Sequence, residues 1–226
     1  CMTLHVYYGG TFDPVHNGHL AIAAAVRDAL DATVRLLPAA DPPHKDATHA
    51  DADQRARMLD LAVAGERGLA VDRRELHREG PSYTVDTLRS LRAELGDQAP
   101  IVWMIGSDSL LQLHTWSRWR ELFTLAHVLA VARPGAHADA QWVAASAPEV
   151  HAEIAPRWRQ ATTLGESPAG GFALFEDLPL RPESSTELRR RMAVGESWDE
   201  WAPPAVAEYI RRHGLYGVRA TRHASL

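Results

Sequence analysis

Short apolar, β-rich runs alternate with longer amphipathic segments along most of the chain. The apolar runs predict strands at residues 4–8, 33–37, 69–71, 101–105, 128–132 and 172–175. The segments between them predict helices at 20–30, 54–64, 83–95 and 116–125. Strands that alternate with helices in this way are typical of a parallel sheet with crossover helices. We therefore expect an α/β fold in which helices flank a parallel sheet.

Capping residues sharpen the limits of one helix in particular. Ser82 precedes the helix expected at 83–95, leucines at 88, 91 and 95 share one face, and Gly96 follows it. A serine before a periodic segment and a glycine after it are the usual signals for a helix start and stop. Ser82 is therefore the expected cap of this helix.

The C-terminal third has a different pattern. Ala, Gly and Pro are frequent from 135 to 171, although 142–150 is compatible with a helix. Ser184 and Glu187 have the spacing of a capping box, so a helix should run from there through Met192 to a stop near Gly195. Pro203-Pro204 opens a last helix that ends at Gly214. We expect one α/β domain over 3–182, a small helical part over 183–217 and a tail over 218–226.

Composition narrows the class of protein. The 226 residues are 46% hydrophobic and 23% charged, with a net charge of −5, which is ordinary for a soluble globular protein. This charge gives no reason to expect a nucleic-acid or membrane partner. The one cysteine, Cys1, rules out a disulfide or a cysteine–zinc site within one chain. Without a signal-like start or an apolar run of about 20 residues, we expect a cytoplasmic enzyme.

The most informative segment is Gly9-Gly10-Thr11-Phe12-Asp13-Pro14-Val15-His16-Asn17-Gly18-His19. It follows the first expected strand and precedes a helix, which is where α/β sheets bind ligands. Glycines allow a phosphate to approach the backbone, helix-start amides favour an anion, and His16 and His19 add two imidazoles. The alternative is a tight turn with two surface histidines. We favour the phosphate site because Gly-Gly, Phe-Asp-Pro and His-x-Gly-His fall in one loop.

Other residues have chemistry that suits the same ligand. Asp108 follows a strand and a glycine, where it can accept hydrogen bonds from a ribose or simply cap a helix. His44 and Lys45 lie on a Pro-rich loop that either closes over phosphates or is solvated. Arg189, one turn into a capped helix, either pairs with phosphate oxygens or is an ordinary exposed arginine. Trp116 offers a flat face to a ring, although a lone tryptophan is more often part of a core.

The glycine- and histidine-containing segment resembles the nucleotidyltransferase superfamily, whose members carry His-x-Gly-His after the first strand. Within that superfamily the chain resembles the bacterial nicotinate mononucleotide adenylyltransferases, over residues 3 to 217. The resemblance continues, in the expected order, through Pro42-Pro43-His44-Lys45, Pro81-Ser82-Tyr83-Thr84, Ile105-Gly106-Ser107-Asp108-Ser109-Leu110, Thr115-Trp116, Arg133-Pro134-Gly135, Ser184-Ser185-Thr186-Glu187-Leu188-Arg189 and His213-Gly214-Leu215-Tyr216. The sequence departs from the family pattern at Glu183, where relatives are usually aliphatic, and at Ser117, where an aromatic is common.

The resemblance implies a Rossmann-like nucleotidyltransferase fold whose nucleotide-binding catalytic domain spans 3–182. The implied reaction joins ATP to nicotinate mononucleotide and gives deamido-NAD and pyrophosphate, with Mg²⁺ accompanying ATP and no metal-ligating residues on the protein. The implied catalytic residues are His16, His19 and Arg189. The implied ATP-binding residues are Gly9, Gly10, Thr11, Phe12, His16, His19, Gly106, Asp108, Arg133, Ser184, Ser185, Thr186 and Arg189. The implied pyridine-nucleotide-binding residues are Thr11, His44, Lys45, Thr84, Trp116 and Ser117.

Three rival functions stay open on the sequence alone. The same chemistry can act on nicotinamide mononucleotide, or a nucleotidyl group can be transferred to another phosphate, as in the phosphopantetheine and glycerol-phosphate enzymes of the superfamily. Those chains tend to be shorter and do not need the Tyr83-Thr84 and Thr115-Trp116 elements. A non-catalytic nucleotide-sensing module is the third, and the presence of both His16 and His19 argues against it.

Overall fold

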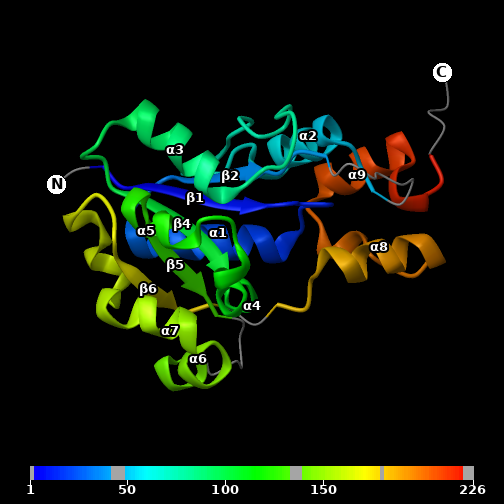
Figure 1. The fold of residues 1–226 in the computed structure, drawn as a ribbon. Coiled ribbons are helices and arrows are strands. Elements are labelled where there is room, and N and C mark those ends of the chain that lie inside the picture. The colour runs from blue at the N-terminus through cyan, green and yellow to red at the C-terminus, as the bar shows by residue number, and fades with distance from the viewer. Residues whose placement is uncertain (1–2, 42–48, 133–138, 179–180, 221–226) are drawn as a thin grey trace.

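The computed structural model describes residues 3–41, 49–132, 139–178 and 181–220. Within these residues six parallel strands form one sheet in the order β3-β2-β1-β4-β5-β6 (Figure 1). The strands are β1 (His5–Gly10), β2 (Val34–Pro38), β3 (Leu69–Val71), β4 (Ile101–Gly106), β5 (His127–Val131) and β6 (Phe172–Phe175). All six expected strands are confirmed. The order reverses between β1 and β4, the arrangement of a Rossmann-like sheet.

Helices cover both faces of this sheet and one of its ends. They are α1 (Asn17–Leu30), α2 (Ala52–Val63), α3 (Thr84–Leu95), α4 (Ser107–Leu111), α5 (Leu122–Leu125), α6 (Ala140–Ser146), α7 (Pro148–Ile154), α8 (Ser185–Val194) and α9 (Pro204–His213). Short 3₁₀ turns join them, among them η1 (Leu113–Thr115), η2 (Trp119–Glu121) and η6 (Leu215–Gly217). Figure 1 shows α8 and α9 beyond the carboxyl end of β1. In the described part of the chain, no helix has the length and apolar character needed to cross a bilayer.

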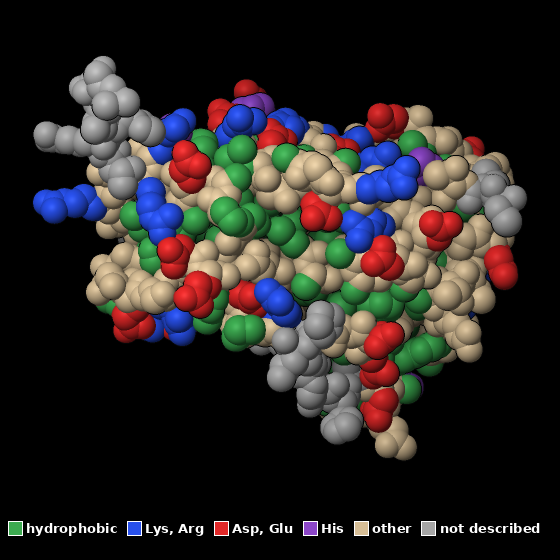
Figure 2. All heavy atoms as spheres, turned by 180° about the vertical axis from the view of Figure 1, so that it is seen from behind, with side chains coloured by type: hydrophobic (Ala, Val, Ile, Leu, Met, Phe, Trp, Pro, Cys, Tyr) green, Lys and Arg blue, Asp and Glu red, His purple; other side chains and the backbone are tan. Residues whose placement is uncertain are grey.

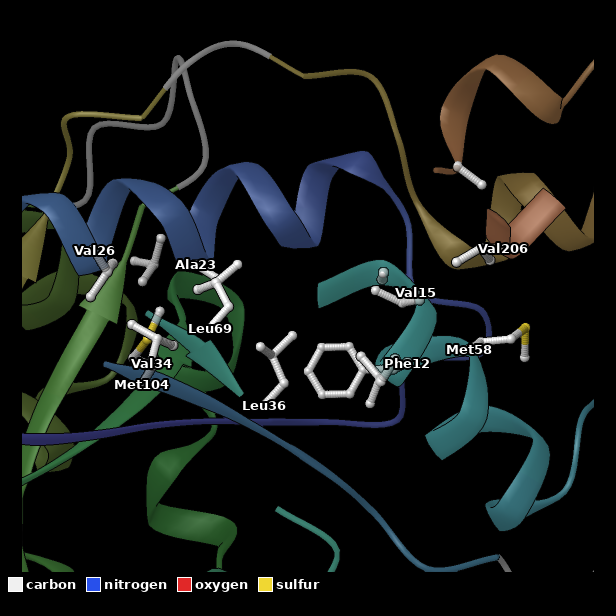
Figure 3. Close-up of a cluster of buried hydrophobic side chains, with 14 of the residues drawn as sticks. Phe12, Val15, Ala23, Val26, Val34, Leu36, Met58, Leu69, Met104 and Val206 are labelled. Atoms are coloured by element: carbon white, nitrogen blue, oxygen red, sulfur yellow. The ribbon is translucent and has the colours of Figure 1, made fainter. Parts of the chain in front are cut away.

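Neighbouring residues of a strand point to opposite faces of the sheet. Because consecutive residues of these strands are apolar, both faces of the sheet are apolar. In β1, Val6 packs into one hydrophobic cluster and Tyr7 into the other. The first cluster also contains Phe12, whose ring lies beside Leu36 and Val15 in Figure 3. Val206 of α9 belongs to this cluster as well. The C-terminal helices thus share a core with the sheet, and the division at residue 182 stays a prediction.

Two expected helices are broken in the structure. The prediction of one helix over 116–125 is wrong, because Trp116 is extended and Arg118 is left-handed at φ 50°. Only η2 and the single turn of α5 follow. The helix expected at 142–150 is also interrupted, since α6 ends at Ser146 and Pro148 opens α7. A proline ring clashes with the preceding turn and cannot continue a helix.

Two of the expected caps differ from the prediction. Ser82 does not cap α3; Tyr83 holds the N-cap position, and the Ser82 hydroxyl donates to Glu75 instead. Ser184 does cap α8, accepting from the amide of Glu187 at 3.1 Å. The carboxylate of Glu187 pairs with arginines on the next turn, so only half of the capping box forms. The stops are confirmed, because α3 ends at Gly96, α8 at Gly195 and α9 at Gly214.

Charged side chains of both signs are interspersed on the face that Figure 2 shows. Across the described residues, many charged side chains form ion pairs, such as Arg74 with Glu94 at 2.6 Å and Arg120 with Glu149 at 3.0 Å. Neighbouring opposite charges cancel over a few ångströms, so this face carries no extended field of one sign.

Candidate active site

A cavity of about 540 Å³ opens at the carboxyl ends of β1 and β4. This is the point where the strand order reverses, and it is where open α/β sheets bind ligands. The size is within the range of small-molecule sites. Its walls include the ends of both strands and the first residues of α1, α4 and α8, among them Tyr8, His16, His19, Asp108 and Ser185.

The two histidines form a reciprocal cap at the start of α1. His16 Nδ1 accepts from the amides of Gly18 at 3.0 Å and His19 at 3.3 Å, and the His16 amide donates to His19 Nδ1 at 3.1 Å. The rings stack with centroids 3.7 Å apart. A side chain at Gly18 would lie 2.9 Å from the His16 ring, which explains the glycine between them. Because each Nδ1 accepts, the neutral form of each ring carries its proton on Nε2.

Burial keeps both imidazoles uncharged near neutral pH. Loss of solvation lowers the pKa of His16 to about 4; Glu183 opposes this shift and Arg181 adds to it. Burial, and then the neighbouring His16, hold the pKa of His19 well below its usual value. The pair therefore supplies two neutral Nε2–H donors rather than two cations. Neutral donors suit a site where negative charge moves during a reaction.

These pKa shifts predict a pH-dependent stability with a definite sign. Above pH 6.5 both histidines are neutral in the folded and unfolded chain. Below it the unfolded chain takes up protons that the folded chain refuses, so the free energy of unfolding falls by roughly 1.4 kcal/mol per pH unit for each histidine. We expect this loss between pH 6.5 and about 4, the pKa of folded His16. Urea unfolding at a series of pH values measures it.

The control for this prediction is His16→Asn. Asparagine is a good N-cap, so the variant keeps the cap of α1 while removing the titrating ring. Its stability should fall less steeply than that of the wild type between pH 6.5 and 4. Parallel curves for the two proteins would contradict the assignment.

The loop between β1 and α1, residues 11–16, is called the histidine loop here. Asp13 connects it to the C-terminal part of the chain. Its Oδ1 accepts from the Ala50 amide at 3.1 Å and from the Tyr216 hydroxyl at 2.5 Å. Its carbonyl oxygen accepts from Nη1 of Arg189 at 2.7 Å. One residue further on, the Pro14 carbonyl accepts from the Ser185 hydroxyl at 2.9 Å. The start of α8 and the turn at Tyr216 thus fix the loop that leads into His16 and the first turn of α1.

A second support is Arg55, which the sequence analysis did not identify. Its side chain is 1% exposed and donates to the carbonyl oxygens of Thr11 at 2.8 Å and Ala39 at 2.7 Å. It also lies 3.3 Å from the carboxylate of Asp41. Arg55 therefore joins the loops that follow β1 and β2. Arg55 is four residues from the apolar Leu59, so the sequence places it on the buried face of a helix. An arginine on a buried face needs hydrogen-bond partners, and this spacing could have identified it.

The two glycines at the start of this segment lie close against aromatic rings. Gly9 and Gly10 are the last residues of β1, and a side chain on Gly9 would meet the Trp103 ring at 2.5 Å. A side chain on Gly10 would lie 3.2 Å from the ring of Phe12. The rings of Trp103 and Phe12 therefore leave little room for a side chain at either position, and the approach of a phosphate to these glycines stays a prediction.

The side chain of Phe12 lies in the core beneath His19. Its side chain is 2% exposed and packs in the core, with its ring edge-on to His19 at 4.9 Å. The side chain therefore supports the His19 ring, and only its backbone can reach a ligand. Its backbone is left-handed at φ 52°, which turns the chain sharply after Thr11.

The cavity brings together part of the predicted site. Gly106, Asp108, Ser184 and Ser185 line it together with both histidines. Among the described residues, other members of the predicted site lie outside its lining, namely Gly9, Gly10, Thr11, Phe12, Thr84, Trp116, Ser117, Thr186 and Arg189. Thr84 begins α3, and half-buried Trp116 packs against the second core cluster. His44, Lys45 and Arg133 lie outside the residues that the structure describes.

The fold and this cavity define a Rossmann-like nucleotide-binding protein of the nucleotidyltransferase type. The sequence profile of the family described as cytidylyltransferase-like matches residues 7–191. A relative from Stenotrophomonas maltophilia, named a probable nicotinate-nucleotide adenylyltransferase, is 49% identical over 95% of this chain and 97% of its own. A relative of the same name from Chromobacterium violaceum is 47% identical over 92% of this chain and 96% of its own. The chain belongs to the nicotinate-nucleotide adenylyltransferases within the cytidylyltransferase-like family.

Solved structures agree on the fold. The nicotinic acid mononucleotide adenylyltransferase of Plasmodium falciparum, complexed with NaAD, aligns with a TM-score of 0.73. It covers 97% of this chain and 100% of its own, at 16% sequence identity. At that identity the likeness concerns the arrangement of the strands and helices.

Proposed function

We propose that this protein transfers the adenylyl group of ATP to nicotinate mononucleotide, giving deamido-NAD and pyrophosphate. The observation that carries the proposal is the mutually capped pair His16 and His19 on the wall of the cavity where the strand order reverses. The names of relatives up to 49% identical support the choice of substrates.

The chemistry needs positioning more than proton transfer. An oxygen of the acceptor's 5′-phosphate bonds to the α-phosphorus of ATP, while the bond from that phosphorus to the pyrophosphate oxygen breaks. A phosphate monoester is already a competent nucleophile, so no strong base and no covalent enzyme intermediate are required. ATP enters as its Mg²⁺ complex, in which the cation is held mainly by phosphates and water. The protein contributes orientation and stabilisation of the moving charge.

Each element at the cavity has a part in this proposal. The Nε2–H groups of His16 and His19 donate to the α-phosphate and the departing pyrophosphate. The first turn of α8, with Ser184, Ser185 and Thr186, holds the β- and γ-phosphates, since a helix start carries unpaired amides. Arg189 assists from the same helix, although its Nη1 is already engaged by the Asp13 carbonyl. Asp108 accepts from the ribose of ATP.

The acceptor occupies the side of the site formed by the segments after β2, β3 and β4. We propose that His44 and Lys45 bind its phosphate and that Trp116 stacks on its pyridine. The extended backbone at Trp116 means that the Ser117 amide is not at a helix start. In contrast, α3 begins at Thr84 without a side-chain cap. The Thr84 hydroxyl and the first amides of α3 are therefore the main donors to a pyridine carboxylate.

An acceptor panel tests this function. With ATP and Mg²⁺, we expect pyrophosphate and a dinucleotide, and a kcat/KM for nicotinate mononucleotide at least on the order of a hundredfold above that for the amide. The amide turns an NH₂ toward a donor, and each unpaired buried group costs roughly 1–3 kcal/mol. Thr84→Val should reduce this ratio. Trp116→Ala should weaken the binding of both mononucleotides and leave the ratio of their kcat/KM values nearly unchanged, because the indole ring stacks equally on either pyridine.

The same panel separates the rival functions. Equal kcat/KM for acid and amide would refute the specificity while leaving adenylyl transfer in place. Turnover only with an unrelated phosphate acceptor would reassign the substrate. Nucleotide binding without pyrophosphate release would indicate a sensing module.

A further inference from the structure

A buried carboxylate lies outside the cavity and has no part in the proposed chemistry. Glu75 follows β3 in a turn and is 1% exposed. Its Oε1 accepts from Arg78 Nη2 at 2.6 Å and from the Thr87 hydroxyl at 2.7 Å. Its Oε2 accepts from the Ser82 hydroxyl at 2.9 Å and pairs with Arg78 Nε. Both oxygens are fully used, which is what a buried carboxylate requires.

These partners bracket one exposed segment. Residues 79–83 are all exposed, and Tyr83 is 44% exposed despite its large aromatic ring. Arg78 precedes the segment, Ser82 lies within it, and Thr87 follows it on α3. Leu76, beside Glu75, packs against Ala52 and Ala56 of α2. One carboxylate, anchored on α2, therefore holds both ends of a segment that is otherwise in solvent.

The carboxylate also sets the first turn of α3. Thr84 and Thr87 are three residues apart and share a helix face. Tyr83 holds the N-cap position of α3, and its side chain makes no capping hydrogen bond. The bonds of Glu75 to Ser82 and Thr87 thus join the entry of α3 to the turn after β3. On the same first turn, Asp86 accepts from Arg118 Nη2 at 3.3 Å.

We propose that Glu75 is a positioning residue for the acceptor nucleotide, acting through Ser82 and Thr87 on the start of α3. The proposal rests on the proposed function, in which Thr84 and the first amides of α3 receive the pyridine substituent. Arg78 neutralises Glu75, so the carboxylate itself does not repel an anionic acceptor.

A positioning role and a purely electrostatic role of Glu75 predict opposite changes in acceptor binding. Glu75→Gln leaves Arg78 without its carboxylate, so a purely electrostatic role predicts tighter binding of an anionic acceptor. The glutamine oxygen can replace only one of the two acceptors, and its NH₂ faces either Arg78 or a hydroxyl. A positioning role therefore predicts weaker binding.

The experiment measures kcat and both KM values for Glu75→Gln, with urea unfolding on the same samples. We expect the KM for nicotinate mononucleotide to rise on the order of tenfold, the KM for the amide to rise less, and the KM for ATP to stay within about twofold. Glu94→Gln is the matched control, since Glu94 lies on α3, the helix that Glu75 contacts, and is 60% exposed beside Arg74. It should leave both KM values unchanged.

Two variants at Thr87 test the same proposal if Glu75→Gln does not fold. Thr87→Val removes the hydroxyl that Glu75 binds at nearly constant volume, and Thr87→Ser retains it. Thr87→Val should raise the acceptor KM, and Thr87→Ser should restore it. An unchanged or lowered acceptor KM, or equal rises in both KM values, overturns the positioning role. If the wild-type protein forms no dinucleotide from any acceptor, the proposed function is refuted, and the positioning role of Glu75 is refuted with it.

Discussion

His19→Ala is expected to lower kcat about a hundredfold, because removing one preorganised donor to developing charge typically costs about 3 kcal/mol. The KM for nicotinate mononucleotide should change little. The His19 ring stacks on His16 at 3.7 Å and is held edge-on by Phe12, so its Nε2–H is fixed before substrate arrives. Steady-state release of pyrophosphate by purified, folded protein measures the effect.

The control separates the chemistry of His19 from its role as a cap. The His16 amide donates to His19 Nδ1, and this bond is lost in His19→Ala. A glutamine at the same helix position can accept that bond, as in an ordinary capping box. His19→Gln should therefore match the wild type in urea unfolding and still turn over slowly. Near-normal turnover in either variant would remove His19 from the catalytic residues.

Arg55→Met is expected to cause the largest loss of stability, about 3 kcal/mol, because two carbonyl groups lose their hydrogen bonds to a buried, charged donor. For a chain of this length such a loss lowers Tm by about 10 °C. The affected carbonyls belong to Thr11 and Ala39, on the loops that follow β1 and β2. Turnover at a temperature where the variant is folded should also fall, since the Thr11 backbone leads into the histidine loop. Thermal unfolding and steady-state kinetics measure the two effects.

Arg57→Ala is the matched control on the same helix. Arg57 is 59% exposed and lies 4.0 Å from Asp60, so its removal should change stability by no more than about 0.5 kcal/mol. Arg55→Lys keeps the charge but lacks the fork that reaches two carbonyls, and it should lie between the wild type and Arg55→Met. A variant Arg55→Met as stable as Arg57→Ala would show that the buried guanidinium does not hold these loops.

Variants at the two parts of the site should change different kinetic constants. In the proposed function, acceptor choice depends on Thr84 and the start of α3, whereas turnover depends on the histidine pair at the start of α1. Variants at Thr84 and Glu75 should thus alter acceptor KM, and variants at His19 should alter kcat. A common change in both quantities for every variant would indicate a general loss of structure.

The sequence by itself determined the order of elements and the place of the loop that leads into His16 and His19. The six strands are short apolar runs between periodic segments, and this local pattern depends only on which residues are buried. The His-x-Gly-His segment was located correctly because a loop between the first strand and first helix must lie at the carboxyl edge of a parallel sheet. Helix stops at Gly96, Gly195 and Gly214 were equally local, since glycine tolerates the conformation that ends a helix.

Only the tertiary structure decided which side chains support that loop and why. Gly9 meets Trp103 of another strand, and Asp13 meets Tyr216, which is 203 residues away along the chain. Ser82, expected to cap its own helix, instead binds the buried Glu75. Such pairs follow from three-dimensional packing between distant segments, and no spacing along the chain encodes them. A local pattern specifies an element, whereas a buried polar group takes whichever partner the fold brings within reach.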